Sequence, residues 1–242
     1  MEIMRVKDYG EMSRAGANLV KGELRKKPTL ASVLASGSSQ VGFLGELSGM
    51  GLNFSLAKFF NLDEYFGLRP DHPQSFNLFL RRNFLNLINA DPKNVHLLSG
   101  LIDKGKVSSY CRDYEKLIAE SGGLDLVILG IGRRTGHIAF NEPGSPFNST
   151  TRLVKLSGET IHDNSRFFSA MSDVPEYAIS MGISTIMSAR MIMLLASGKE
   201  KADILAKALQ GPVTEQVPAS ILQRHQNAII ISDEAAASKL KP

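Results

Sequence analysis

The spacing of apolar residues changes repeatedly along the chain, and these changes predict an alternation of strands and helices. Short apolar runs with branched side chains are typical of strands buried inside a parallel sheet. The run over residues 124–130 is the clearest of them. Strands are predicted over residues 2–6, 29–34, 56–62, 95–98, 124–130 and 228–232, with further elements over 177–186 and 191–197.

Between these runs, apolar residues recur at intervals of three and four, which is the spacing of a helix with one buried face. Helices are predicted over residues 9–26, 40–47, 74–87, 109–121 and 199–209. A long polar loop is expected after Pro143. Because long loops in compact domains are often functional, we expect residues 144–175 to act as a mobile lid.

Strands that alternate with helices in this way predict an α/β fold, with a doubly wound, mainly parallel sheet and helices on both faces. No linker, repeat or low-complexity stretch divides the chain, so residues 1–242 are expected to form a single domain. The fold would be Rossmann-like without a dinucleotide. The glycines at Gly130, Gly132 and Gly136 are spaced one residue too widely for the G-x-G-x-x-G fingerprint.

The composition is that of an ordinary soluble globular protein, with 43% hydrophobic and 21% charged residues. The net charge of +4 is a mild excess. Nucleic-acid-binding proteins usually gather Lys and Arg on one face, and no such cluster is visible in the sequence. We therefore expect no nucleic-acid partner, and the basic residues could instead bind a phosphorylated small molecule.

The single cysteine, Cys111, excludes an intramolecular disulfide and a cysteine-based zinc site. The first residues lack the apolar core of a signal peptide, and no run approaches the ~18 apolar residues that span a bilayer. A cytoplasmic location without a membrane partner is expected. No metal is predicted, because no metal-ligand spacing connects the histidines outside the loop described next, which are His72, His96, His162 and His225.

The most informative stretch follows the strand over 124–130 and reads Gly-His-Ile-Ala-Phe-Asn-Glu-Pro, residues 136–143. Parallel α/β sheets bind ligands at the carboxyl ends of their strands, where this loop begins. His137 and Glu142 could form a hydrogen-bonded pair in which the carboxylate orients the imidazole for acid/base work. The alternative is a structural histidine bonded to a loop carbonyl in an ordered turn.

A second candidate is Asp63, which with Glu64 follows the strand over 56–62. Successive side chains point to opposite sides, so one carboxylate is expected to face the ligand crevice and the other to face away. We favour Asp63, whose pKa could be raised by burial so that it carries a proton to and from carbon. The alternative is an acid at a turn or helix start.

Ser36, Gly37, Ser38 and Ser39 lie where a strand passes into a helix, so their N–H groups and hydroxyls could cradle a phosphate at the helix N-terminus. A serine N-cap with a glycine turn would give the same sequence. No Gly-Lys-Ser or Gly-Lys-Thr follows, which argues against a nucleoside triphosphate. Two further phosphate ligands could be Arg166 and Lys201, although either could be a solvated surface residue.

Taken together, these stretches resemble the glucosamine-6-phosphate deaminase family over nearly the whole chain, in its short bacterial form. The segments that carry the resemblance are residues 34–39, 61–65, 136–143, 164–168, 198–202, 218–223 and 233–238. The resemblance implies conversion of glucosamine 6-phosphate and water to fructose 6-phosphate and ammonia, without a redox cofactor or a metal. It leaves the choice between a monomer and a homo-oligomer open.

The resemblance also implies a role for each matching residue. His137 would move a proton to the ring oxygen as the pyranose opens, with Glu142 holding the imidazole. Asp63 would carry a proton between C2 and C1. The phosphate would be held by the residues named above, Ser36, Gly37, Ser38, Ser39, Arg166 and Lys201.

The chain departs from the family pattern ahead of Gly136, where three residues, Arg133, Arg134 and Thr135, replace the usual two. The position held by Thr135 is usually Asp or Asn and belongs to the ring-opening group, so ring opening is expected to be altered. Gln40 also stands where the phosphate loop commonly has a proline. Arg152 matches a basic position of the family's allosteric site but Val154 does not, and the chain ends early, so we expect weak or absent activation by N-acetylglucosamine 6-phosphate.

Two alternatives remain. A related hydrolase, 6-phosphogluconolactonase, shares the fold and the Gly-His motif, but its acidic loop typically has Arg where this chain has Tyr65. The third interpretation is a non-catalytic sugar-phosphate sensor. Such sensors normally carry an N-terminal helix-turn-helix, and only one short strand precedes the first helix here.

Overall fold

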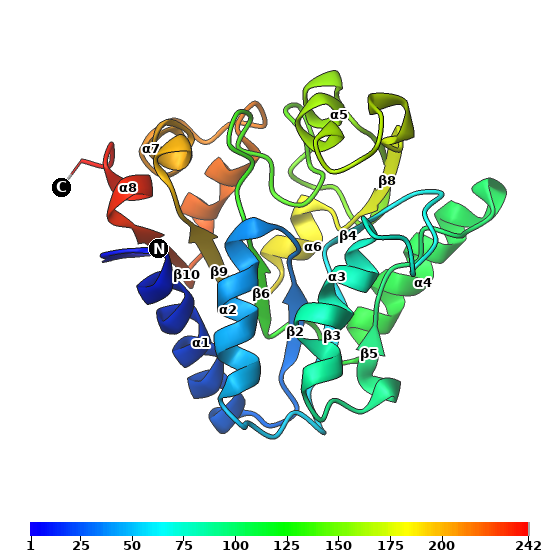
Figure 1. Cartoon of the computed structure of the whole chain (residues 1–242), viewed down its shortest axis with the longest axis horizontal. Helices are drawn as coiled ribbons and strands as arrows, with labels where there is room; N and C mark the ends of the chain where they lie inside the picture. Colours follow the sequence, from blue (N-terminus) through cyan, green and yellow to red (C-terminus); the bar gives the residue numbers. More distant parts are fainter. Residues whose placement is uncertain (242) are drawn as a thin grey trace.

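The computed structural model describes residues 1–241 and is built around a seven-stranded sheet in which all strands are parallel (Figure 1). Its strand order is β1, β10, β9, β6, β2, β3, β5. The doubly wound α/β fold predicted from the sequence is confirmed. The strands are β1 (Glu2–Val6), β2 (Ala31–Leu34), β3 (Lys58–Asn61), β5 (Val95–His96), β6 (Leu126–Leu129), β9 (Met191–Ala196) and β10 (Ala228–Asp233).

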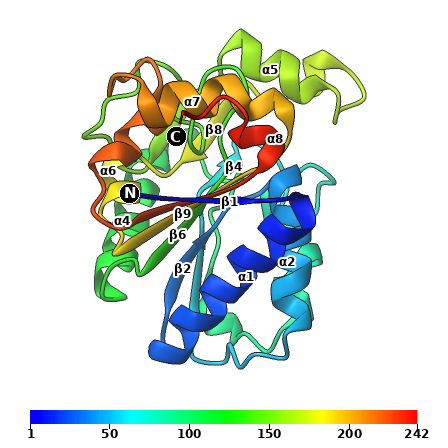
Figure 2. The same ribbon diagram turned by 90° about the vertical axis from the view of Figure 1, so that its left-hand side faces the viewer.

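Helices cover both faces of this sheet, as Figure 2 shows with the sheet seen on edge. One face carries α1 (Tyr9–Lys26), α2 (Ser38–Gly49) and α3 (Phe76–Asn83). The other face carries α4 (Val107–Glu120), α6 (Ile183–Met187), α7 (Ala202–Gln210) and α8 (Glu234–Ala237). The short 3-10 helices are Leu85–Leu87, Pro92–Asn94, Lys104–Lys106, Met171–Asp173, Lys199–Lys201 and Pro218–Arg224.

The alternation of side chains along the central strands divides the core between the two helical layers. In β6, Leu126 and Ile128 pack into the cluster with α1 and α2, while Val127 and Leu129 pack into the cluster with α4 and α7. All four are 0–1% exposed. A strand apolar on both sides is what a sheet buried between two layers requires. The packed core therefore fixes the position at which each strand ends and the loop that follows it begins.

A second, antiparallel sheet lies above the carboxyl ends of the main sheet and was not predicted from the sequence (Figure 1). It consists of β4 (Asp63–Tyr65), β8 (Tyr177–Ser180) and β7 (Arg152–Lys155). The strand predicted over 56–62 is therefore shorter, and Asp63 begins a new strand rather than following the old one. The element over 177–186 is likewise two, β8 and α6.

The prediction of a long polar loop over 144–175 is wrong, because this segment contains β7 and the helix α5 (Gly158–Ser165). Strand β7 forms by pairing with β8, a partner more than 20 residues away. The N-terminus of α5 is capped by Ser157, whose hydroxyl accepts a hydrogen bond from the Thr160 N–H at 3.1 Å. The segment that we expected to be a loop is thus an ordered strand and helix above the sheet.

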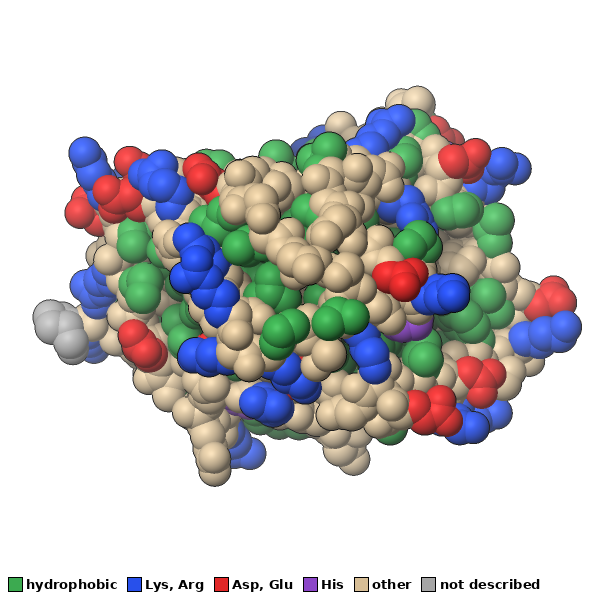
Figure 3. Space-filling view, turned by 90° about the horizontal axis from the view of Figure 1, so that it is seen from below, with side chains coloured by type: hydrophobic (Ala, Val, Ile, Leu, Met, Phe, Trp, Pro, Cys, Tyr) green, Lys and Arg blue, Asp and Glu red, His purple; other side chains and the backbone are tan. Residues whose placement is uncertain are grey.

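Among the other elements, the strand over 2–6 and the helix over 9–26 are confirmed to the residue. The helix predicted over 74–87 is shorter, since Ser75 caps it and the chain turns into a 3-10 helix after Phe84. In residues 1–241 no helix is both long enough and apolar enough to cross a membrane. On the face opposite the second sheet, Lys and Arg side chains are scattered among apolar and acidic ones (Figure 3).

Candidate functional site

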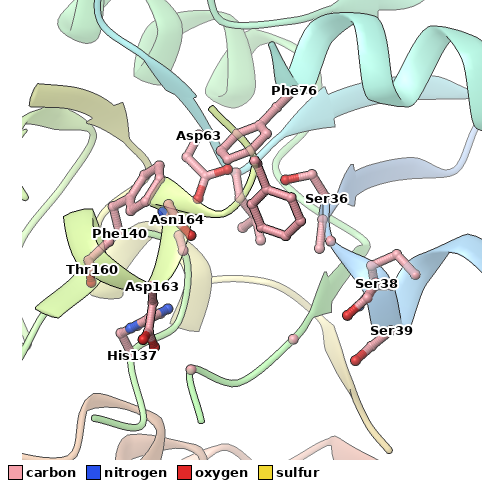
Figure 4. Close-up of a pocket in the computed structure, with 18 of the residues that line it drawn as sticks. Ser36, Ser38, Ser39, Asp63, Phe76, His137, Phe140, Thr160, Asp163 and Asn164 are labelled. Carbon is pink, nitrogen blue, oxygen red and sulfur yellow. The ribbon is translucent and has the colours of Figure 1, made fainter. Parts of the chain in front are cut away.

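A cavity of about 520 Å³ opens at the carboxyl edge of the main sheet (Figure 4). Its walls come from the loop after β2, the start of β4, the loop after β6, and α5. This is where an open parallel sheet is expected to bind its ligand. Of the ten site residues predicted from the sequence, nine line the cavity: Ser36, Gly37, Ser38, Ser39, Asp63, Thr135, His137, Arg166 and Lys201.

The serine-glycine loop forms one side of the cavity at the N-terminus of α2 (Figure 4). The N-cap position is Gly37, with φ of 120°, a conformation that favours glycine. No side chain caps this helix, so the serine N-cap that we considered as an alternative is absent. The hydroxyls of Ser36, Ser38 and Ser39 are left beside the positive end of a 12-residue helix. This arrangement suits an anion.

Asp63 is the first residue of β4, held in register opposite Ser180 of β8. It is 7% exposed, and its side chain points into the cavity (Figure 4). Burial, with the neighbouring Glu64 carboxylate second, raises the pKa of Asp63 to about 8. A carboxyl group with such a pKa exchanges a proton near neutral pH, which is the property of a general acid/base.

Glu64 faces the other way, as the alternation along a strand requires. Its carboxylate accepts hydrogen bonds from the Ser75 hydroxyl at 2.7 Å and from the Asn77 N–H at 2.9 Å. Further hydrogen bonds come from the N–H groups of Tyr65 and Phe76. Glu64 therefore anchors the start of α3, whereas Asp63 is the member of the pair that reaches the cavity.

His137 lies in a tight loop that directly follows β6. The loop closes on itself through hydrogen bonds between Gly132 and His137, N–H to carbonyl at 2.9 Å, and between Gly136 and Gly132 at 3.0 Å. The imidazole Nδ1 lies 2.8 Å from the Thr135 hydroxyl. Burial lowers the pKa of His137 below its usual value of 6.5, so the ring is neutral at pH 7.

The direct hydrogen bond expected between His137 and Glu142 is not formed, since Nδ1 lies 3.8 Å from Glu142 Oε2. The other carboxylate oxygen of Glu142 accepts a hydrogen bond from the Thr160 hydroxyl on α5. Among the described residues, Oε2 is buried and has no hydrogen-bond partner. Glu142 thus stands behind the imidazole as a nearby negative charge, oriented from α5, while Thr135 is the residue that contacts the ring.

The two cations predicted to bind phosphate, Arg166 and Lys201, lie in the cavity wall, as do Arg133 and Arg134. The Lys201 ammonium donates a hydrogen bond to the Ile131 carbonyl at 2.7 Å, and burial lowers its pKa. Arg166 follows α5 directly, and its guanidinium lies 4.6 Å from the ring centroid of Phe167. Lys201 is half-buried and is not a solvated surface residue, whereas Arg166 is exposed at the edge of the cavity, so the surface alternative is excluded for Lys201 alone. The cavity therefore combines positive charge with the serine-glycine loop.

Several cavity residues were not singled out from the sequence. Phe76 lies beside Asp63 in Figure 4 and belongs to an aromatic group with Tyr65 and Phe140, at ring-centroid distances of 4.9 to 5.8 Å. This apolar wall is one reason why Asp63 is so poorly hydrated. Thr160 and Asp163 come from α5, in the segment expected to be a loop. In residues 1–241, no three His, Cys, Asp or Glu side chains gather where they could hold a metal ion.

The fold and the site together define a class of α/β protein whose cavity, above the carboxyl edge of a parallel sheet, is lined by a buried carboxyl group, an imidazole and a serine-glycine loop at a helix N-terminus. A sequence model of the glucosamine-6-phosphate isomerases/6-phosphogluconolactonases matches residues 10–231. This match and the relatives below show that the chain belongs to the glucosamine-6-phosphate isomerase/6-phosphogluconolactonase family.

Relatives of full length agree with this assignment. The chain is 46% identical over 247 residues to glucosamine-6-phosphate deaminase 2 of Bacillus subtilis, with 100% of this chain and 98% of the relative covered. It is 43% identical over 245 residues to a glucosamine-6-phosphate deaminase of Clostridium botulinum, with 100% and 99% covered.

Solved structures give the same result for the fold. A monomeric glucosamine-6-phosphate deaminase superposes with a TM-score of 0.95 at 37% identity, covering 99% of this chain and 100% of that one. A 6-phosphogluconolactonase from Thermotoga maritima superposes with a TM-score of 0.76 at 18% identity, covering 96% and 99%. At that identity the second likeness concerns the fold alone.

Proposed function

We propose that this protein is a glucosamine-6-phosphate deaminase, which converts glucosamine 6-phosphate and water to fructose 6-phosphate and ammonia. The observation that carries the proposal is a buried Asp63 with a pKa of about 8 in the same cavity as a serine-glycine loop and the cations Arg166 and Lys201. Asp63 can move a proton at carbon, and the serine-glycine loop and the cations can hold a phosphate. The names of the full-length relatives support the same reaction.

In this proposal the phosphate lies at the N-terminus of α2. The hydroxyls of Ser36, Ser38 and Ser39 and the backbone at Gly37 contact it, and Arg166 and Lys201 supply positive charge. Arg166 can bind two phosphate oxygens through its planar fork, whereas Lys201 acts as a point charge. Anchoring this end of the sugar holds C1 and C2 near the acid/base groups.

Ring opening is assigned to His137. Its neutral imidazole has one N–H donor and one acceptor nitrogen, so it can pass a proton from the C1 hydroxyl to the ring oxygen. Thr135 contacts Nδ1 and so helps to hold the ring in place. Glu142, at 3.8 Å, stabilises the positive charge that builds up while the imidazole holds both protons.

Asp63 is assigned to the carbon chemistry. As a carboxylate it removes the C2 proton of the open aldose, which gives an enolamine, and it returns the proton to C1. The product is an imine at C2, to which water adds, and the C–N bond then breaks to release ammonia and the ketose. A group that gives and takes a proton in turn works best with a pKa near the working pH, as Asp63 has.

The test is a comparative assay of the purified protein. With glucosamine 6-phosphate we expect equal amounts of ammonia and fructose 6-phosphate, and with 6-phosphogluconolactone no hydrolysis above the spontaneous rate. Turnover of the lactone instead would move the protein to the hydrolase branch of the family. Binding of the sugar phosphate without any turnover would leave the sensor interpretation.

We further infer that the enzyme works in the cytoplasm on a small-molecule substrate, without nucleic acid or membrane partners. The buried, unpaired Cys111 fits a reducing compartment. The relative with a TM-score of 0.95 is described as monomeric, which supports a monomer here over a homo-oligomer. Light scattering of the purified protein tests the monomer directly.

A further inference from the structure

Helix α5 is connected to the loop after β6 at two points, both through polar side chains on its inner face. Thr160 donates to Glu142, and three residues later Asp163 pairs with Arg133. Residues three apart in a helix lie on the same face, and Figure 4 shows Thr160 and Asp163 on the side of α5 that faces the cavity. The helix therefore meets the catalytic loop through Thr160 and Asp163 together.

The pair between Asp163 and Arg133 has the two-bond geometry of a strong ion pair. Arg133 Nη2 lies 2.9 Å from Asp163 Oδ1, and Arg133 Nε lies 3.1 Å from Oδ2. Arg134 Nε lies 3.4 Å from the same Oδ1. The Asp163 side chain is only 21% exposed. Exposed pairs contribute little to stability, but a two-bond arginine fork within a small network is the exception.

The short helix needs such contacts. Eight residues do not make a stable helix in water. Of these eight only Thr160 is buried, and Ile161 is the one apolar residue that packs on the aromatic group beside the cavity. Polar contacts therefore contribute much of what holds α5 over the cavity. Arg166, assigned above to the phosphate, follows the last turn of this same helix.

We propose that Asp163 is a positioning residue, which by pairing with Arg133 and Arg134 holds α5 against the catalytic loop and so places Arg166 at the phosphate and Thr160 on Glu142. Arg133 and Arg134 belong to the segment in which this chain has three residues where the family usually has two. The hydrogen bonds from Arg133 keep the pKa of Asp163 below its usual range, so the pair is charged throughout the neutral pH range.

For Asp163→Asn, the proposal predicts a change in phosphate affinity opposite to the change expected from charge alone. Asp163→Asn removes a negative charge beside a cationic cavity and frees Arg133, which by charge alone would tighten the binding of an anion. If Asp163 positions α5, the same change lets Arg166 move away, and binding weakens. We expect the dissociation constant for inorganic phosphate, measured by calorimetry, to rise about three- to fivefold, the factor typical of such a pair.

Catalysis gives a second readout, which rests on the proposed function. For glucosamine 6-phosphate we expect Asp163→Asn to lower kcat and raise KM, because both Thr160 and Arg166 are displaced. Thr160→Val removes the hydroxyl that orients Glu142 but leaves the Asp163 ion pair in place, so it is expected to lower kcat about tenfold with a smaller loss of phosphate affinity than Asp163→Asn causes. This separation of KM from kcat would not follow from general loosening of the fold.

The chain supplies a matched control in Arg69 and Asp71, another two-bond arginine–aspartate pair with both distances at 3.0 Å. Asp71 does not line the cavity, so Asp71→Asn should leave phosphate affinity and turnover unchanged. As a second way to break the contact, Arg133→Gln combined with Arg134→Gln should weaken phosphate binding. Adding Asp163→Asn to that variant should then weaken it no further.

Tighter or unchanged phosphate binding in Asp163→Asn, with cooperative unfolding like that of the native protein, would overturn the proposal. The proposal would also be overturned if the losses of phosphate affinity caused by the arginine changes and by Asp163→Asn added together in the combined variant. Because phosphate binding needs no turnover, the two proposals fail separately. A native protein that is inactive on glucosamine 6-phosphate but shows the predicted loss of phosphate affinity would refute the deaminase assignment alone.

Discussion

Asp63 on the β4 wall of the cavity and Asp163 on the α5 wall are both carboxyl groups beside the same space, but their surroundings differ. Asp63 has no hydrogen bond to its carboxyl oxygens among the described residues, and burial raises its pKa to about 8. Asp163 is held by Arg133 and Arg134, and the hydrogen bonds from Arg133 lower its pKa. One wall keeps an acid without a partner, and the other keeps its charges paired.

The difference follows from what holds each wall in place. The β4 wall is fixed by backbone pairing with β8 and by the four hydrogen bonds to Glu64, so it can carry one poorly hydrated acid. The α5 wall is an eight-residue helix, and its charged side chains contribute to holding it. The acid that titrates near neutral pH thus lies where backbone hydrogen bonds hold the chain in place. Functional sites commonly tolerate an unfavourable group in this way, because the surrounding structure is stable enough to keep it there.

The largest effect is expected from Asp63→Asn, which removes the titrating group of the β4 wall. Turnover of glucosamine 6-phosphate should fall about 10²- to 10⁴-fold, the range for loss of a general acid/base. Phosphate affinity should persist, because no phosphate ligand is changed. Steady-state kinetics and calorimetry with inorganic phosphate measure the two quantities. Activity within tenfold of the native enzyme would remove Asp63 from the reaction.

The same variant should be more stable than the native protein at neutral pH. Between the unfolded value of 3.8 and the folded value of about 8, the native state holds a proton that the unfolded state releases. The free energy of unfolding of the native protein therefore falls as pH rises through this window. The amide introduced by Asp63→Asn does not titrate, so the advantage of the variant should grow from pH 4 to 8 and reach a few kcal/mol. A pH-independent difference in urea unfolding would contradict this.

The loop after β6, which carries His137, is tested next by Gly132→Ala. A Cβ at this position would lie much closer to Cε1 and Nδ1 of the His137 imidazole than van der Waals contact allows. The φ of Gly132 is not in the left-handed region, so the clash acts without backbone strain. We expect kcat to fall about 100-fold, as a displacement of about 1 Å can cause.

Gly130→Ala is the matched control for that change. It lies two residues earlier in the same loop, and its added Cβ would meet only Gln40 Nε2, at an ordinary 3.6 Å. A loss of at most a few-fold is expected for it, measured with the same assay. Equal losses in the two variants would mean that the position of His137 is not what Gly132 protects.

The parts of the site that the sequence predicted are those set by local pattern. A short apolar run such as β6 identifies a buried strand, and in a parallel sheet the residues just after such strands meet at one edge. That rule is sufficient to bring Ser36, Asp63 and His137 together from the sequence alone. It needs no knowledge of which strands are neighbours.

What the sequence did not predict depends on pairing between distant segments. Strand β4 is three residues long and β7 reads Arg-Leu-Val-Lys, and neither has a pattern of its own until β8 lies beside it. The residues of α5 were missed for the same reason. Thr160 and Asp163 become informative only when the helix lies against Glu142 and Arg133, because a lone threonine or aspartate in a polar stretch is usually solvated.

The smallest expected effect comes from placing a carboxyl group next to His137 in the loop after β6, so that this loop, like the β4 wall, carries an acid. Thr135→Asp puts a carboxylate where the hydroxyl now lies 2.8 Å from Nδ1. An adjacent negative charge favours the protonated imidazole, so the lowered pKa of His137 should move upward. Because proton transfer is fastest when the pKa is near the working pH, kcat/KM at pH 6 to 7 should rise about two- to fivefold.

Nuclear magnetic resonance of the imidazole protons follows the titration of His137. The control is Thr135→Val, which keeps the shape of the native threonine and adds no charge. If His137 titrates at lower pH in Thr135→Asp than in Thr135→Val, the local charge does not control this ring.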